Sequence, residues 1–131
     1  MPRLEGILET CVYAADLEAA EHFYCDVIGL EVYAKMEGRH VFFRCGKGMF
    51  LVFNPEATSV EGTPFPVHGA TGPGHAAFEV KPEALESWRV RLSEAGVRIE
   101  TEIDWPNGGH SIYFRDPAGN SIELATRQTW S

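Results

Sequence analysis

An acidic residue stands in the middle of an apolar strand near the end of the chain, where it could bind a metal ion. Residues 113–124 predict strand, turn and strand, because Asp-Pro-Ala-Gly at 116–119 has type I turn preferences. Side chains alternate between the two faces of a strand, so the aliphatic neighbours of Glu123 share one face and Glu123 occupies the other. Tyr113 is expected beside it. If this face lines a cavity, Glu123 is well placed to hold a metal.

A histidine precedes the same hairpin. His110 follows the turn Asn107-Gly108-Gly109 and begins the strand that carries Tyr113. Imidazole titrates near neutral pH, so a histidine close to a metal could transfer a proton. A histidine in a surface loop is the alternative, and the sequence leaves both open.

The elements that must position these residues follow the same order in each half of the chain. In the first half, residues 6–13 predict a strand, Asp16 an N-cap, and Gly29 the end of the helix between them. In the second half, a strand at 75–80 precedes a helix that begins at Pro82 and ends at Gly96. Three strands follow each helix, at about 30–36, 39–45 and 49–54, and at about 97–103, 109–115 and 120–127. The expectation is one domain of two modules, 6–54 and 75–127.

Residues 55–74 separate the two halves and are rich in Pro, Gly, Thr and Ser. Twenty residues without clear periodicity form a long connection for a compact domain, and such loops are commonly functional or flexible. We expect a linker that also covers a cavity.

Composition excludes several classes of function. The chain has 131 residues, 44% hydrophobic and 23% charged, as in an ordinary globular domain. A net charge of −8 without a basic stripe argues against nucleic acid as a partner. The three cysteines have no Cys-x-x-Cys spacing, and no run of 18 apolar residues or export signal occurs. A cytoplasmic location away from the membrane is therefore expected.

The order of elements and four local motifs resemble the vicinal oxygen chelate superfamily, which includes glyoxalase I, extradiol dioxygenases, fosfomycin resistance proteins and bleomycin-binding proteins. The resemblance implies an α+β fold of paired βαβββ modules that form a curved mixed sheet around a metal cavity, and a homodimer. Its motifs are Asp16-Leu17-Glu18, Phe23-Tyr24 with Gly29-Leu30, Gly72-Pro73-Gly74-His75, and Asp116 to Glu123.

The resemblance also implies three metal ligands: Glu9 on the first strand, His75 on the fifth and Glu123 on the last. Alternation independently places all three on the faces turned away from the helices. Each residue alone has a simple structural explanation, but the three together favour a divalent metal, with Zn, Ni, Co, Mn or Fe open.

Glyoxalase I has a fourth ligand, a carboxylate, where this chain has Leu51. Leu51 cannot bind a metal, so the site would keep open positions, as catalytic metal sites do. Because that carboxylate is the base in glyoxalase I, its replacement argues against that exact reaction. Phe53 alternates with Leu51 toward the same face, and Trp105 and Arg115 are further candidates for the wall of a substrate pocket.

The leading interpretation is a metal-dependent lyase or isomerase that acts on a small substrate with two vicinal oxygens, with His110 and Tyr113 as acid/base or orienting groups. One alternative is a metal-free small-molecule binding protein like the bleomycin-binding members. The other is an iron extradiol dioxygenase, in which a tyrosine stands ten residues before the last ligand, as Tyr113 does before Glu123. Glu9 in place of a histidine argues against the dioxygenase. No basic cluster supports a fosfomycin resistance protein.

Overall fold

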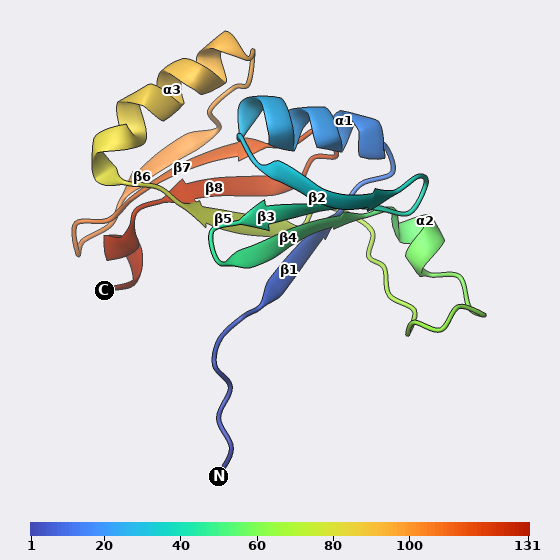
Figure 1. The fold of residues 1–131 in the computed structure, drawn as a ribbon. Helices are drawn as coiled ribbons and strands as arrows, with labels where there is room; N and C mark the ends of the chain where they lie inside the picture. Colours follow the sequence, from blue (N-terminus) through green and yellow to red (C-terminus); the bar gives the residue numbers. More distant parts are fainter. The chain divides into compact units, whose positions relative to one another are not determined.

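The computed structural model describes all residues from Met1 to Ser131. The chain divides into two compact units, Met1–Thr71 and Gly72–Ser131. Each contains strand, helix and three strands, and each forms its own four-stranded mixed sheet (Figure 1). The predicted α+β class and the paired βαβββ modules are therefore confirmed.

The helix of unit 1 begins where Asp16 predicts. The carboxylate of Asp16 accepts a hydrogen bond from the backbone N–H of Ala19, which caps α1 (Leu17–His22). The helix continues as a π-helical turn, η1 (Phe23–Val27), and the chain leaves it at Gly29 with a φ of 88°. This positive φ is a conformation that glycine adopts readily and other residues rarely do, so Gly29 ends the helix.

The sheet of unit 1 has the order β1-β4-β3-β2. Strands β1 and β4 run parallel and the other neighbours antiparallel. Tyr24 of η1 is fully buried against Phe43 and Phe50, whose rings lie 5.7 and 4.9 Å from its own. This aromatic core leaves the opposite face of the sheet for other contacts. The strands are β1 (Glu9–Tyr13), β2 (Glu31–Met36), β3 (His40–Cys45) and β4 (Gly48–Phe53).

The segment expected as a linker begins with a short helix, α2 (Pro55–Thr58). Asn54 caps it by accepting a hydrogen bond from the backbone N–H of Glu56, and Pro55 occupies its first turn. Composition did not reveal this helix because it is a single turn. Residues 55–71 belong to unit 1.

Unit 2 repeats the topology with the order β5-β8-β7-β6, and β5 and β8 run parallel. Leu92 of its helix is fully buried, as are Ile112, Phe114 and Ile122 on one face of the sheet. Strand β6 is shorter than the predicted 97–103, and β8 stops before a final 3₁₀ turn. The elements are β5 (His75–Glu79), η2 (Pro82–Ala84), α3 (Leu85–Glu94), β6 (Thr101–Asp104), β7 (His110–Arg115), β8 (Ser121–Ala125) and η3 (Arg127–Trp130).

None of the helices is both long enough and apolar enough to cross a bilayer.

Candidate metal centre

Unit 2 brings His75 and Glu123 together on the sheet face opposite α3. The Nε2 atom of His75 lies 3.4 Å from Oε1 of Glu123. Two ligand atoms about 2.1 Å from one metal, at a tetrahedral angle, are themselves about 3.4 Å apart. The same distance is long for a direct hydrogen bond. The spacing fits two donors to one cation, as it fits an ion pair when His75 is protonated, and imidazole with carboxylate is a donor set that zinc and related metals accept.

A backbone contact orients the ring of His75. Its Nδ1 lies 2.9 Å from the carbonyl oxygen of Ser121, the residue directly opposite it in the parallel β5–β8 pair. A carbonyl only accepts, so Nδ1 carries a proton, and in the neutral ring Nε2 presents its lone pair toward Glu123. This is the arrangement by which metal-binding histidines are usually held.

A short chain of hydrogen bonds holds the carboxylate of Glu123. Its Oε2 accepts a bond from the hydroxyl of Ser111 at 2.5 Å, and that hydroxyl accepts one from the indole N–H of Trp105 at 2.9 Å. Ser111 is fully buried and Glu123 nearly so. With Oε2 occupied by Ser111, Oε1 is the oxygen left for a ligand.

The sequence-based interpretation missed Ser111, although its position contained the signal. Ser111 and Tyr113 are two residues apart on β7, so they share the face that Glu123 occupies. Trp105, which we expected as a pocket wall, reaches this face through its contact with Ser111.

The turn of the last hairpin holds the backbone that leads into His75. The carboxylate of Asp116 accepts bonds from the backbone N–H groups of Ala118 and Asn120 and from the side-chain amide of Asn120. The Asn120 side-chain oxygen accepts the N–H of Gly74 at 2.7 Å, across 46 residues. The turn therefore holds the residue immediately before His75.

Tyr113 lies directly opposite Glu123 in the antiparallel β7–β8 pair. Burial, followed by the nearby carboxylate of Glu123, raises the pKa of the Tyr113 phenol above its ordinary value. At neutral pH the hydroxyl is therefore protonated and can donate a hydrogen bond on this face.

His110 lies on the other face of β7. An odd spacing of three residues separates it from Tyr113, and its ring contacts Glu102 and Asp104 at 2.6 and 2.7 Å. The hydrogen bond to Glu102, with a further contribution from Asp104, raises the pKa of His110. Arg89 of α3 also binds Glu102, through two of its nitrogens. The structure thus places His110 in an ion-pair cluster beside α3, not beside Glu123.

The remaining candidate of unit 2, Arg115, shares a face with Tyr113 as expected. Its guanidinium binds the carboxylate of Glu100 and the carbonyl of Gly119. These contacts hold the Arg115 side chain at the end of β7.

Unit 1 carries the other candidates on one face of its sheet. In unit 2, His75 on β5 and Glu123 on β8 are two register positions apart; in unit 1 the same relation links Glu9 on β1 with Leu51 on β4. Glu9 is therefore the counterpart of His75, and Leu51 that of Glu123. Phe53 follows on the same face. The structure does not gather three or more His, Cys, Asp or Glu side chains into one metal-binding group.

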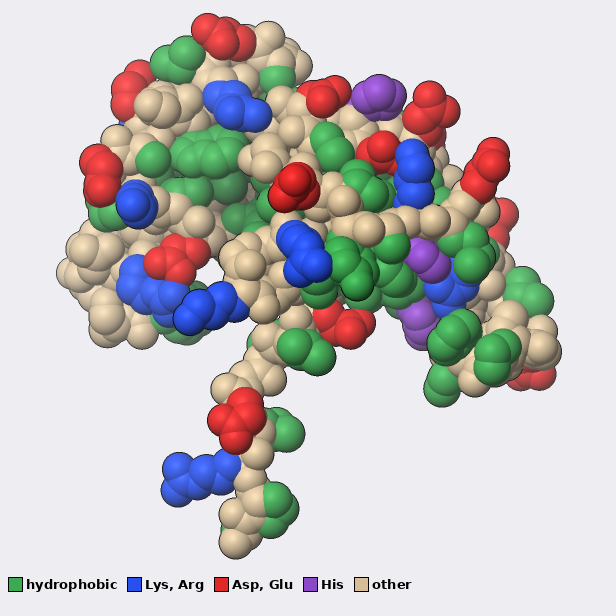
Figure 2. All heavy atoms as spheres, viewed as in Figure 1, with side chains coloured by type: hydrophobic (Ala, Val, Ile, Leu, Met, Phe, Trp, Pro, Cys, Tyr) green, Lys and Arg blue, Asp and Glu red, His purple; other side chains and the backbone are tan.

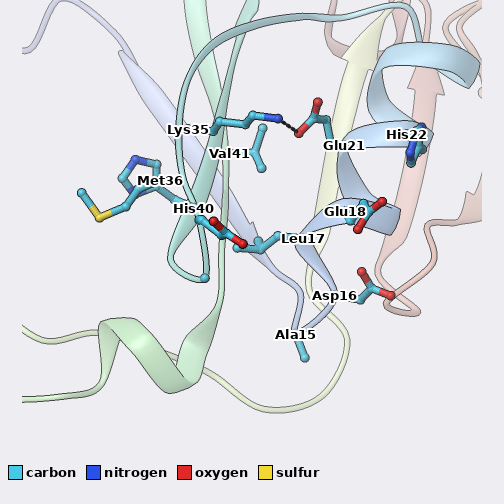
Figure 3. A pocket seen from close by; sticks show the side chains of 12 residues that line it. Ala15, Asp16, Leu17, Glu18, Glu21, His22, Lys35, Met36, His40 and Val41 are labelled. Atoms are coloured by element: carbon cyan, nitrogen blue, oxygen red, sulfur yellow. Dashed lines mark hydrogen bonds and ion pairs between the residues drawn. The ribbon is translucent and has the colours of Figure 1, made fainter.

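A pocket of about 900 Å³ lies between α1 and the β2–β3 hairpin of unit 1 (Figure 3). Its wall includes Glu18 and Glu21 of α1, and Lys35 of β2 forms an ion pair with Glu21 at 2.9 Å. None of the residues predicted for the site lines it. The pocket is distinct from the His75–Glu123 pair.

Comparisons with known proteins agree with the fold and the repeat. The chain is 42% identical to lactoylglutathione lyase from Agrobacterium tumefaciens in a crystal structure, with a TM-score of 0.95 and 99% of both chains covered. It is 31% identical to catechol-2,3-dioxygenase of Bacillus subtilis over 123 residues, 87% of this chain, and spans 40% of that protein's length. It is 29% identical to metallothiol transferase FosB of Bacillus licheniformis, over 95% of this chain and 77% of that protein.

The sequence model of one superfamily matches residues 6–124, nearly the whole chain and both βαβββ units. Its members include metal-dependent enzymes of several reaction types, which agrees with the paired donor atoms of unit 2. The chain belongs to the Glyoxalase/Bleomycin resistance protein/Dioxygenase superfamily.

Proposed function

We propose that this protein is a metal-dependent lyase or isomerase that acts on a small substrate with two vicinal oxygens. The observation that carries the proposal is the spacing of His75 Nε2 and Glu123 Oε1, 3.4 Å apart, with each donor oriented from behind by its own hydrogen bond. Such support is characteristic of metal centres, because outer partners fix the direction of the lone pairs that bind the ion.

In this proposal His75 and Glu123 are two ligands and Glu9 is the third. The assignment of Glu9 rests on its register position in unit 1, where it is the counterpart of His75. With Leu51 at the fourth position, coordination sites remain for the substrate. A bound divalent ion would act as a Lewis acid that polarises two substrate oxygens. Zn, Ni, Co, Mn and Fe all suit these donors.

The other groups have simpler tasks. Tyr113, protonated at neutral pH, donates a hydrogen bond to a substrate oxygen beside Glu123. Leu51 and Phe53 form an apolar wall. For His110 the proposal differs from our expectation, since its ion pairs with Glu102 and Asp104 suit stabilisation of unit 2 more than proton transfer.

The similarity to lactoylglutathione lyase makes lactoylglutathione the first compound to test. Because Leu51 stands where glyoxalase I has its basic carboxylate, any such activity would need a different base. A homodimer is part of the proposal through the superfamily resemblance, and the three free cysteines favour a reducing cytoplasm.

A second candidate, an extradiol dioxygenase, is favoured by the position of Tyr113 directly opposite Glu123 and by the similarity to a catechol dioxygenase. It predicts oxygen uptake with catechol by the iron-loaded protein and loss of that uptake in Tyr113→Phe. No uptake by the iron-loaded protein would eliminate this candidate.

Metal binding tests the leading proposal directly. Protein purified without added metal is analysed for metal content, then stripped with chelator and titrated calorimetrically with Zn²⁺ and Mn²⁺. We expect one ion per chain. His75→Ala and Glu123→Gln should weaken binding by more than the about 10–100-fold typical of outer-shell changes.

The matched control is His22→Ala, which removes an exposed histidine from α1. It should bind metal like the natural protein. The proposal fails if the natural protein takes up neither ion, or if His22→Ala loses as much affinity as His75→Ala. Failure to take up either ion, together with ligand binding that ignores chelator and Glu123→Gln, would instead identify a metal-free binding protein.

A further inference from the structure

Arg39 of unit 1 is an arginine without an acidic partner, held among aromatic rings. Its guanidinium lies 5.5 Å from the ring centre of Phe53 and 5.3 Å from that of Phe65. One N–H donates to Nδ1 of His40 at 2.7 Å. None of the ion pairs in the structure includes Arg39, although the chain carries a net charge of −8. By contrast, Arg89, Arg115 and Arg127 each form an ion pair with a glutamate.

The rings around Arg39 form a connected cluster on the face that carries Glu9. Phe53 is its centre, with the rings of His68 and His40 at 4.7 and 6.0 Å. Burial, and then the charge of Arg39, lowers the pKa of His40, so this ring is neutral at pH 7 and can accept the bond from Arg39. In Figure 2 histidine and Lys/Arg side chains adjoin one another beside the segment that follows α2.

His68 supplies a second hydrogen-bond donor, and the neighbouring Tyr13 determines which ring nitrogen carries the proton. The hydroxyl of Tyr13 lies 2.6 Å from its Nδ1. With the phenol as donor, Nδ1 accepts and the ring proton lies on Nε2, which becomes available to an external acceptor. Arg39 and His68 thus present N–H groups from two different loops around Phe53.

One residue fixes both loops. Asn54 donates its backbone N–H to the carbonyl of Arg39 at 2.8 Å and its side-chain amide to the carbonyl of Gly38 at 3.1 Å. It also caps α2, whose last residue, Thr58, accepts the backbone N–H of His68 at 3.0 Å. The position of the cluster is therefore built into unit 1.

We infer that Arg39 and His68 form a binding site for the carboxylate of a small organic acid whose apolar part packs on Phe53. The planar guanidinium has N–H donors left after its bond to His40, and its fork matches a carboxylate. An anion would supply the counter-charge that the chain itself does not. The aromatic walls favour an acid with a flat or apolar group over a bare inorganic ion.

The site would lie on the same sheet face of unit 1 as Glu9, the proposed third metal ligand. Tyr13 is four residues beyond Glu9 on the same face of β1, a separation of roughly 13 Å along the strand. If the proposed function is correct, the substrate carries an anionic group at that distance from its metal-chelating oxygens; this link rests on the proposed function, whereas the carboxylate site rests on unit 1 alone.

Binding of phenylacetate to the full chain tests the inference, with chelator present so that metal plays no part. Calorimetry or chemical-shift titration should show saturable binding, weakened about tenfold or more in Arg39→Gln, as expected when a charge-assisted bond is lost. Arg39→Lys should bind phenylacetate with an affinity between those of the natural protein and Arg39→Gln, because lysine keeps the positive charge but lacks the forked pair of N–H donors. The control is Arg44→Gln at the far end of β3, where the guanidinium lies over Tyr33. It should bind within about twofold of the natural protein, as expected for an arginine outside the site.

Two further probes identify the recognised group. The neutral amide of phenylacetate should bind at least about tenfold more weakly than the acid, and phenylphosphonate distinguishes a site for any anion from a carboxylate site. Equal affinity for acid and amide, tighter binding of the phosphonate, or an equal loss in Arg44→Gln would overturn the inference. Glu123→Gln should retain phenylacetate binding, so a failed metal assay and a failed carboxylate site are told apart.

Discussion

Ser111→Ala tests whether the carboxylate of Glu123 is held in place from behind. The substitution removes one hydroxyl and leaves two groups without their partner: Oε2 of Glu123 and the indole N–H of Trp105. Because Ser111 is fully buried, water cannot simply replace the hydroxyl. A bond to a charged group contributes about 1.5–3 kcal/mol and a neutral one about 1 kcal/mol. The free energy of unfolding should therefore fall by about 2.5–4 kcal/mol.

Metal affinity should fall as well, because Glu123 is then free to rotate. Loss of an outer partner typically weakens metal binding about 10–100-fold. Urea unfolding of the metal-free protein measures the first effect, and calorimetric titration with Zn²⁺ measures the second. The losses of unfolding free energy caused by Trp105→Phe and by Ser111→Ala should not add in the double variant, since both residues belong to the same chain of hydrogen bonds.

Ser121→Ala is the matched control. Ser121 lies on the same sheet face, and only its backbone carbonyl contacts His75, so the substitution leaves that bond intact. It should change the free energy of unfolding by less than about 0.5 kcal/mol. Equal unfolding midpoints for Ser111→Ala and Ser121→Ala would refute the idea that the hydroxyl supports Glu123.

Two other predictions concern the framework of unit 2. His110→Gln should lower the free energy of unfolding by about 1–2 kcal/mol at pH 6 and by much less at pH 9, measured by urea unfolding across pH. The sign follows from the raised pKa of His110: its contribution is complete below the unfolded pKa and is lost as pH rises through the folded one. A loss that does not change with pH would contradict this. Asn120→Ala should lower the free energy of unfolding by about 2–3 kcal/mol, because the hydrogen bonds of its buried amide to Gly74 and Asp116 are lost. The same substitution should weaken Zn²⁺ binding at His75. Undiminished Zn²⁺ affinity would show that the turn does not position His75.

Local patterns accounted for the elements and for the faces of the strands. Alternation assigned Glu123 and Tyr113 to one face, and the register shows them directly opposite each other. Asp16 capped its helix as expected. Such features depend on neighbours two to four residues away, and a single sequence contains that information.

The same alternation could have shown that His110 and Tyr113 point to opposite faces of their strand, since the spacing between them is odd. Proximity along the chain favoured grouping them, and the ion pairs of His110 with Glu102 and Asp104 became visible only in the structure. Local patterns did not reveal α2 either, because one helical turn leaves little periodicity.

The amino-acid sequence by itself determined the repeated βαβββ order, the superfamily motifs and the candidate donors His75 and Glu123. Only the tertiary structure decided which atoms those donors present. The pairing of β5 with β8 brings the carbonyl of Ser121 to His75 across 46 residues, and Asn120 reaches Gly74 over the same separation. Likewise, Asn54 connects the loop of Arg39 with α2, whose residue Thr58 bonds the loop of His68. Contacts of this kind depend on strand register and loop closure, which are set by packing of the whole unit and not by any local pattern.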